Sequence, residues 1–293
     1  MKPVPFAYHR PATVAEAVEL LATLDEPKVL AGGQSLVPLM NFRMAAPANL
    51  VDVSRLDELA GIDVDDRAVT VGAAVTHTEL LEHTRAVAAV PLLGQAERLV
   101  AHEVIRNRGT VCGSLAHADP AGELTAVLAL LGGSVEALSV RGPRTIPAAD
   151  LFVGPLMSSV ADDELVTAAR FPRPSATTST AIREVARRHG DYAVCGALVA
   201  VDRPTPTGPI ASARAAFLSV GPTPVVIDLD PVVAGRSPSD IDRGQLYDHV
   251  IDRVDPSEDI HATADYRRHL AGVLAGQAVG DALVDPPREV ARV

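Results

Sequence analysis

The chain has 293 residues, and its 26 Lys and Arg against 37 Asp and Glu give a formal net charge of −11. With 47% hydrophobic and 22% charged residues, it has the composition of a folded globular protein and not of a disordered one. The acidic charge and the 3% aromatic content, without Trp, argue against a nucleic-acid partner, because such a partner needs phosphate contacts and base stacking.

The two cysteines, Cys112 and Cys195, are too few for a disulfide framework or for an iron–sulfur cluster. The first residues lack the apolar core of a secretion signal, and the most apolar stretch, 124–135, is too short to cross a bilayer. We therefore expect a cytoplasmic protein without a transmembrane segment. The histidines show no metal-ligand spacing, so no metal site is expected.

Local signals predict helices and short strands in the first half of the chain. Thr13 and Glu16 form a capping-box pattern that begins a helix, and residues 25–27 end it. Short strands are expected at 28–31, 49–53 and 68–75, and an amphipathic helix at 91–102.

The second half begins with a loop expected at 106–114. Asp119 is then a good N-cap, Pro120 a good first helical residue and Gly132 a good stop for the next helix. The remaining expected elements are strands at 135–140, 192–201 and 211–220 and helices at 241–251 and 264–278. The Pro- and Ser/Thr-rich segment 172–180 predicts a boundary between two domains.

Two glycine-containing loops each follow an apolar segment: Ala31-Gly32-Gly33-Gln34-Ser35-Leu36 and Gly109-Thr110-Val111-Cys112-Gly113-Ser114. Glycine allows a close approach of the backbone to a ligand, and successive backbone N–H groups form a nest for anionic oxygen. Together with the hydroxyls of Ser35, Thr110 and Ser114, the pair fits a pyrophosphate without any Lys. Each loop alone is explained better as a tight turn, and neither matches a Rossmann fingerprint or a P-loop.

A pair of acidic residues and one polar segment each have a functional and a structural interpretation. Asp119 and Glu123 would accept hydrogen bonds from a ribose or an adenine, or they cap and complement a helix N-terminus. The run 183–192 would bring cations and the ring of Tyr192 to phosphate and to a planar cofactor. The alternative is a solvated basic segment followed by an ordinary core Tyr.

Taken in order, these segments resemble the FAD-binding medium subunit of molybdenum hydroxylases, as in carbon monoxide dehydrogenase and the xanthine dehydrogenase family. The resemblance covers nearly the whole chain. It is carried by residues 5–11, 29–38, 105–114, 116–120, 187–193, 220–224 and 266–270. It departs from the commonest pattern at Cys112, where a glycine is frequent, and a Cys there narrows the backbone freedom of the second loop.

The resemblance implies an α+β fold in two domains. An FAD-binding domain of the molybdopterin dehydrogenase (PCMH-like) type would occupy 1–174, with subdomains at about 1–57 and 58–174. A smaller α+β domain of the carbon monoxide dehydrogenase flavoprotein C-terminal type would occupy 180–282, followed by a flexible tail at 283–293.

The resemblance also implies the cofactor site, with FAD as the cofactor. The diphosphate side would comprise Val29, Leu30, Ala31, Gly32, Gly33, Gln34, Ser35, Leu36, Gly109, Thr110, Gly113, Ser114 and Ala116. Val100 and Ala101 would line the cofactor, with Leu165 packed near it. Gly122 and Glu123 would lie at the ribose and adenine side. Arg183 would lie near the flavin ring, with Tyr192 against the isoalloxazine as the catalytic residue.

The function implied is that of an oxidoreductase subunit that supplies only the flavin step. Its partners would be a molybdopterin-binding large subunit and a small subunit whose [2Fe–2S] clusters deliver electrons to FAD, which passes them to an external acceptor. If the acceptor is NAD⁺, Tyr192 is a candidate gate of the flavin face. Two alternatives are a free-standing FAD-dependent oxidoreductase acting on a small molecule and a scaffold that keeps the fold without the cofactor. Two open diphosphate loops argue against the scaffold.

Overall fold

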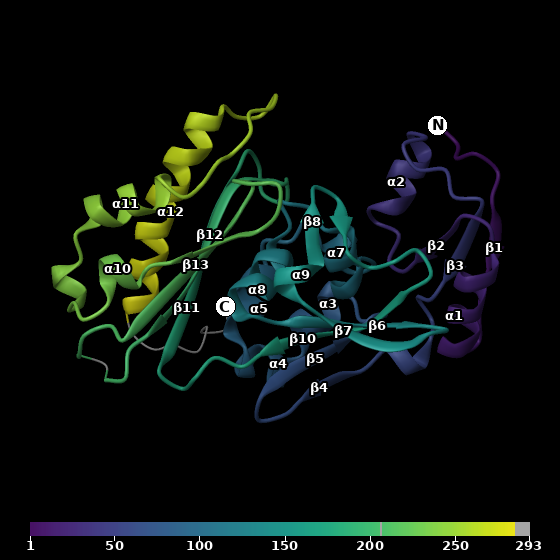
Figure 1. Cartoon of the computed structure of the whole chain (residues 1–293), viewed down its shortest axis with the longest axis horizontal. Coiled ribbons are helices and arrows are strands. Elements are labelled where there is room, and N and C mark those ends of the chain that lie inside the picture. Colours follow the sequence, from purple (N-terminus) through teal and green to yellow (C-terminus); the bar gives the residue numbers. More distant parts are fainter. Residues whose placement is uncertain (206, 285–293) are drawn as a thin grey trace.

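The computed structural model describes residues 1–205 and 207–284, and its three main β-sheets lie side by side along the long axis of the molecule (Figure 1). The N-terminal sheet lies at one end and the C-terminal helices lie at the other. Helices and strands are mixed in each part, as expected for an α+β fold. Among the described residues, no helix is both long and apolar enough to cross a membrane.

The N-terminal unit is a three-stranded parallel sheet in the order β1-β3-β2 with two helices. Its elements are β1 (Ala7–His9), α1 (Val14–Thr23), β2 (Pro27–Leu30), α2 (Leu36–Asn41) and β3 (Asn49–Asp52). Thr13 caps α1 as predicted, because its side chain accepts from the Glu16 N–H. The Glu16 carboxylate accepts from the N–H of Ala12 and not from that of Thr13, so the second half of the expected capping box is displaced by one residue.

The middle unit is a five-stranded antiparallel sheet in the order β4-β5-β10-β6-β7. Its strands, with the small β8-β9 pair, are β4 (Ile62–Val64), β5 (Ala68–Gly72), β6 (Ser134–Ser139), β7 (Gly142–Pro147), β8 (Phe152–Gly154), β9 (Met157–Ser158) and β10 (Leu165–Pro172). Its helices are η1 (Asp57–Leu59), α3 (His77–Glu82), α4 (Thr84–Ala89), α5 (Pro91–Glu97), α6 (Glu103–Arg106), α7 (Val111–His117), α8 (Glu123–Leu131) and α9 (Ala148–Leu151).

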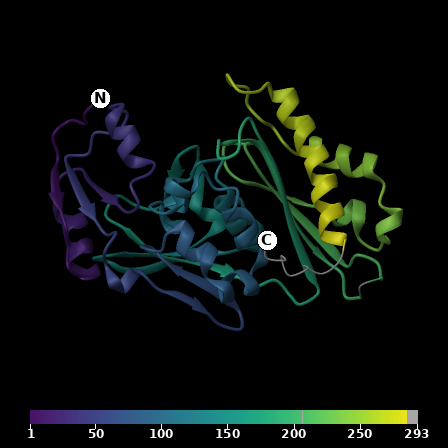
Figure 2. The same cartoon turned by 180° about the vertical axis from the view of Figure 1, so that it is seen from behind.

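The C-terminal unit is a four-stranded antiparallel sheet in the order β11-β12-β13-β14. Its elements are β11 (Thr178–Ala186), β12 (Ala193–Asp202), β13 (Ser212–Leu218), β14 (Val225–Asp228), α10 (Asp230–Val233), η2 (Pro238–Asp240), α11 (Arg243–Ile251) and α12 (Ala264–Leu283). Figure 2 shows α12 on the face of this sheet that points away from the rest of the chain.

Alternate residues of the C-terminal sheet enter two different hydrophobic cores. Leu198 and Ala216 pack into the core of the middle unit, whereas Val199 and Ala215 pack against α12. Because successive side chains of a strand point to opposite faces, the sheet is buried on both sides. One face therefore belongs to the junction with the first two units, and this junction positions the site described below.

Several expected elements have other limits in the structure, and the strand expected at 68–75 ends at Gly72. The helix expected from Asp119 begins only at Glu123, because the Asp119 carboxylate accepts from the Ala121 N–H and closes a turn of its own. The helix expected at 91–102 ends at Glu97. The loop expected at 106–114 is half helical, since α7 begins at Val111.

The C-terminal end of the chain also differs in part from the expectation. The helix expected at 264–278 continues to Leu283, so the first residue of the expected flexible tail is helical. Val284 is the C-cap residue of α12, and the remaining residues of that tail, 285–293, lie outside the described residues.

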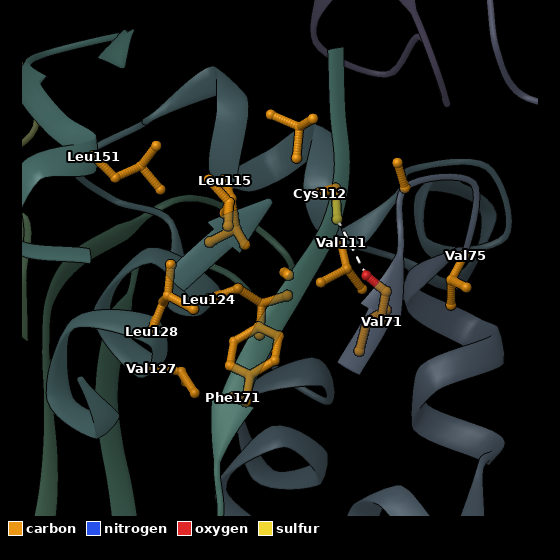
Figure 3. Close-up of a cluster of buried hydrophobic side chains, with 14 of the residues drawn as sticks. Val71, Val75, Val111, Cys112, Leu115, Leu124, Val127, Leu128, Leu151 and Phe171 are labelled. Carbon is orange, nitrogen blue, oxygen red and sulfur yellow. Dashed lines mark hydrogen bonds between the residues drawn. The ribbon is translucent and has the colours of Figure 1, made fainter. Parts of the chain in front are cut away.

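The second glycine loop rests on a hydrophobic core. Figure 3 shows Val111, Cys112 and Leu115 of α7 packed toward Val71 of β5 and Phe171 of β10. The Cys112 thiol donates to the Val71 carbonyl oxygen at 3.5 Å, and burial raises its pKa to about 12. Cys112 therefore acts as a small core residue, and its side chain points away from the loop surface.

Candidate functional site

The two glycine loops lie in direct contact. A Cβ on Gly32 would stand 2.1 Å from the Arg108 carbonyl oxygen and 2.7 Å from the Gly109 Cα, so only glycine fits at this crossing. Gly33 has a φ of +74°, a left-handed conformation that also favours glycine. Both glycines of the first loop are thus required by the backbone, and their effect is to hold the two loops together.

Short backbone contacts fix the second loop. Thr76 and Thr110 form an isolated antiparallel bridge, and the Val111 N–H donates to the Val75 carbonyl oxygen at 3.2 Å. The side chain of Thr110 caps α7 by accepting from the Gly113 N–H at 3.1 Å. A Cβ on Gly113 would lie 3.9 Å from the Ala31 Cβ, which places the start of α7 beside the first loop.

The hydroxyl groups named from the sequence lie on the two contacting loops. Ser35 precedes α2 without capping it by its side chain, and Ser114 lies in the middle of α7. The first turn of α2 offers backbone N–H groups without helical acceptors. In α7 the Val111 and Gly113 N–H groups already donate to the Val75 carbonyl oxygen and to Thr110 Oγ1. Gln34 differs from the expectation for a ligand residue, because its side-chain amide donates to the Gly32 carbonyl oxygen within its own loop at 3.3 Å.

Behind the second loop, three side chains from separate segments form a chain of hydrogen-bond contacts. His77 Nδ1 lies 3.0 Å from Glu97 Oε2, and His77 Nε2 lies 2.9 Å from Ser114 Oγ. His77 and Glu97 are 2% and 0% exposed, so water does not reach this pair. Sequence reasoning missed both residues, because 20 positions separate them and no spacing pattern links them.

A second part of the site is the turn at Val100 and Ala101. Ala101 has a φ of +43°, and the Arg106 guanidinium donates to the carbonyl oxygens of both residues, at 2.8 and 2.9 Å. A Cβ on Gly190 would lie 2.5 Å from the His102 ring, so the segment before Tyr192 packs directly on this turn. The structure thus connects the expected lining residues with the segment that carries Tyr192.

A cavity of about 760 Å³ lies between the middle and C-terminal units, with Tyr192 on its wall. Asp119 and Pro120 line it from one side, and Arg187 and Arg267 line it from the other. The Ser219 N–H donates to the Pro120 carbonyl oxygen at 2.9 Å and so joins the two sides. Tyr192 is 69% exposed, and partial desolvation with the nearby carboxylates of Asp119 and Glu123 raises its pKa.

Two carboxyl groups are buried at the same junction. Burial, and next the charge of Glu184, raise the pKa of Glu123 to about 8. Burial raises the pKa of Glu184 to about 7. Among the described residues, nothing hydrogen-bonds to the buried Oε2 of Glu184. Such an oxygen needs a donor, and a bound ligand with hydroxyl or N–H groups supplies one.

The structure does not bring every expected residue to the site. Arg183 forms an ion pair with Asp281 of α12, on the outer face of β11, while its neighbour Glu184 faces the junction. Successive residues of a strand point to opposite faces, so Glu184 faces the junction when Arg183 faces outward. Sequence alone could not decide which face points inward. Leu165 is fully buried in the core of the middle unit. Val29 and Ala116 are partly buried against the same core.

The remaining expected residues lie at the ends of secondary-structure elements. Leu30 ends β2 directly before the first loop, Leu36 begins α2, and Gly122 is the N-cap residue of α8 before Glu123. The chemistry of these groups fits FAD. Backbone N–H groups and hydroxyls suit its diphosphate, and the unpartnered Glu184 oxygen suits its hydroxyl or N–H donors.

Two family models cover almost the whole chain. The model described as the FAD binding domain in molybdopterin dehydrogenase matches residues 4–174. The model of the CO dehydrogenase flavoprotein C-terminal domain matches residues 180–282.

Curated relatives match over their full length. The nicotine 6-hydroxylase medium subunit of Paenarthrobacter nicotinovorans is 38% identical over 283 residues, which cover 96% of this chain and 99% of that protein. Caffeine dehydrogenase subunit beta of Pseudomonas sp. (strain CBB1) is 37% identical over 288 residues, which cover 96% of each chain.

Solved structures have the same fold. A chain of quinoline 2-oxidoreductase from Pseudomonas putida 86 superposes with a TM-score of 0.90 at 31% identity, covering 97% of this chain and 98% of that one. A chain of reconstituted CO dehydrogenase from Oligotropha carboxidovorans gives a TM-score of 0.90 at 31% identity, covering 98% and 100%.

Proposed function

The chain belongs to the family of FAD-binding medium subunits of molybdenum hydroxylases, and on that premise we propose how its own residues hold and serve the cofactor. It is an oxidoreductase subunit whose cofactor is FAD. Its partners are a molybdopterin-binding large subunit and a small subunit with [2Fe–2S] clusters. The relatives are themselves named as subunits or chains of larger enzymes, which favours this function over a free-standing flavoenzyme.

The two contacting glycine loops hold the diphosphate of FAD. The crossing of Gly32 with Arg108 carries this proposal, because it brings the backbone N–H groups of the first loop beside the hydroxyl-bearing second loop. Ser35 and Thr110 then donate from opposite sides of the crossing. Residues 31–36 and 109–114 contain no Lys or Arg, although Arg108 directly precedes the second loop, so the donors within the loops are backbone N–H groups and hydroxyls.

The ring of FAD belongs at the cavity that Tyr192 lines. When bound, FAD supplies a centre that accepts electrons from an iron–sulfur partner and releases them to an external acceptor. Tyr192 packs against the ring and limits access to one of its faces. The turn at Val100 and Ala101 supports Tyr192 through the contact of Gly190 with His102.

The carboxyl group of Glu123 lies near enough to Tyr192 to raise the pKa of the tyrosine, and this proximity indicates which part of FAD Glu123 would contact. A cofactor with its ring at Tyr192 and its diphosphate at the glycine loops brings its ribityl chain between them. We therefore assign Glu123 and Glu184 to the ribityl hydroxyls in place of the adenine side expected for Glu123. We also propose that the two domains occupy residues 1–174 and 180–282. The proposed location of the protein is the cytoplasm.

The first experiment is the visible absorption spectrum of the chain purified alone, with the released cofactor identified by chromatography. We expect bound or readily added FAD in the wild type and none in a Gly32→Val variant. As a control, Gly276→Ala changes a glycine whose Cβ would meet no atom within 4 Å, and it should keep the cofactor. A wild type that refuses added FAD would overturn the proposal.

Assays with different electron donors and acceptors then distinguish an electron-transfer subunit from a free-standing flavoenzyme. As a subunit, the FAD-loaded chain should be inert toward small-molecule substrates until an iron–sulfur partner supplies electrons. Turnover of a small molecule by the isolated chain would favour the free-standing flavoenzyme instead.

A further inference from the structure

We propose that His77 is a positioning residue for the cofactor diphosphate, acting through Ser114, and this inference rests on the proposed function above. His77 is buried between a carboxylate on one side and a hydroxyl of the second loop on the other. Its ring does not face the diphosphate directly. It decides which way the proton of the Ser114 hydroxyl points.

The contacts of the imidazole are specific on both sides. Both oxygens of Glu97 lie near Nδ1, at 3.1 and 3.0 Å, and an ionised carboxylate accepts only, so Nδ1 carries a proton. The nearest partner of Nε2 is Ser114 Oγ at 2.9 Å. The backbone holds this geometry, because the His77 N–H donates to the Gly109 carbonyl oxygen at 3.0 Å.

A buried carboxylate is costly unless it is paired, and the His77 ring is the partner that Glu97 has in this structure. With a proton on Nε2 as well, the imidazolium donates to Ser114 Oγ. The Ser114 proton is then free to point out of the protein, toward a diphosphate oxygen. With a neutral imidazole, Nε2 instead accepts the Ser114 proton, and the hydroxyl offers the diphosphate only lone pairs.

In its charged form, the pair also supplies charge beside the loops. The positive ring then stands next to Ser114, and the negative Glu97 carboxylate stands on the far side of the ring. An anion at the loops therefore meets the positive end of a buried dipole. This would add to the donors of residues 31–36 and 109–114, which include no Lys or Arg of their own.

The variant that tests this is Glu97→Gln, which keeps a hydrogen-bond acceptor for Nδ1 but removes the charge that holds the second proton. We expect it to weaken FAD binding about tenfold, the effect of roughly one charge-assisted hydrogen bond. Ser114→Ala should weaken binding by a similar factor. The double variant should be no weaker than Ser114→Ala, because both changes remove the same donor. Glu82→Gln, an exposed change of equal charge on α3, is the matched control.

The measurements are FAD titration of the full chain, the ³¹P resonances of the bound diphosphate, and the thermal unfolding of the cofactor-free protein. The ³¹P resonances in Glu97→Gln should move in the same direction as those in Ser114→Ala. The proposal for His77 would be overturned if Glu97→Gln left the FAD affinity unchanged. It would also be overturned if Glu97→Gln weakened FAD binding as much in the Ser114→Ala background as in the wild type. Neither result would contradict FAD binding itself. His77→Gln serves as a second variant if Glu97→Gln does not fold. A wild type that binds no FAD would overturn the proposed function itself.

Discussion

Gly32 and Arg108 stand so close that one added Cβ at Gly32 would lie 2.1 Å from the Arg108 carbonyl oxygen. This contact joins segments that are far apart in the sequence and brings both glycine loops to one surface. The glycine is thus needed for the packing of the protein, and the same packing creates the candidate diphosphate site. The structural interpretation of the first loop therefore holds at this position, and the functional one stays a prediction.

Gly32→Ala is expected to separate the two loops, because its new methyl group has no space and the obstacle is backbone. We expect a loss of FAD and a decrease of about 2 kcal/mol in the free energy of unfolding, a typical cost of overpacking. Absorbance of the purified protein and chemical denaturation measure the two effects. Full FAD occupancy in this variant would show that the loops need not touch.

Glu123→Gln should make the stability of the cofactor-free protein less dependent on pH. The pKa of Glu123 is raised to about 8 in the fold, mainly by burial, from an ordinary 4.5. Above the ordinary value the unfolded chain releases this proton before the folded chain does, so the free energy of unfolding falls as pH rises from about 5 to 8. Gln keeps the neutral form, and at about pH 9 the variant should be the more stable by a few kcal/mol.

The comparison requires thermal unfolding of wild type and variant at several pH values. Raising the pH should lower the melting temperature of the wild type more than that of Glu123→Gln. Parallel curves would mean that the buried carboxyl is not neutral in the fold. Glu82→Gln, with its exposed side chain, should run parallel to the wild type.

Tyr192→Ala should change how the bound flavin exchanges electrons, whereas Tyr192→Phe should stay near the wild type. The ring packing is lost only in the Ala variant, and an aromatic contact of this kind is worth about 1 kcal/mol, or several-fold in FAD affinity. Rapid-mixing measurements of flavin reduction and reoxidation, with several acceptors, provide the test. Unchanged kinetics with every acceptor would remove the gating role of Tyr192.

Arg183→Ala is expected to leave FAD binding unchanged within about twofold. Its guanidinium pairs with Asp281 on the outer face of the C-terminal sheet, and the side chains are 51% and 41% exposed. An ion pair this open to solvent contributes at most about 1 kcal/mol to stability. A large loss of FAD affinity in this variant, measured by titration, would place Arg183 at the cofactor after all.

The sequence predicted those features that local chemistry decides. Thr13 begins α1 because its side chain reaches an N–H in the first turn, and Gly132 ends α8 because its φ of +64° suits glycine. The order of the glycine loops and of the later motifs predicted the family and the cofactor, which the comparisons confirmed.

Only the tertiary structure decided which side chains face the cofactor junction. Strand β11 offers Arg183 and Glu184 to opposite faces, and the sequence carries no sign of which face meets the first two units. His77, Glu97 and Ser114 come from three helices, and packing alone brings them into hydrogen-bond distance. Local patterns set the elements because the forces within a turn or a cap act over a few residues. A row of buried, hydrogen-bonded side chains depends instead on contacts between distant segments, and these contacts exist only once the core has formed.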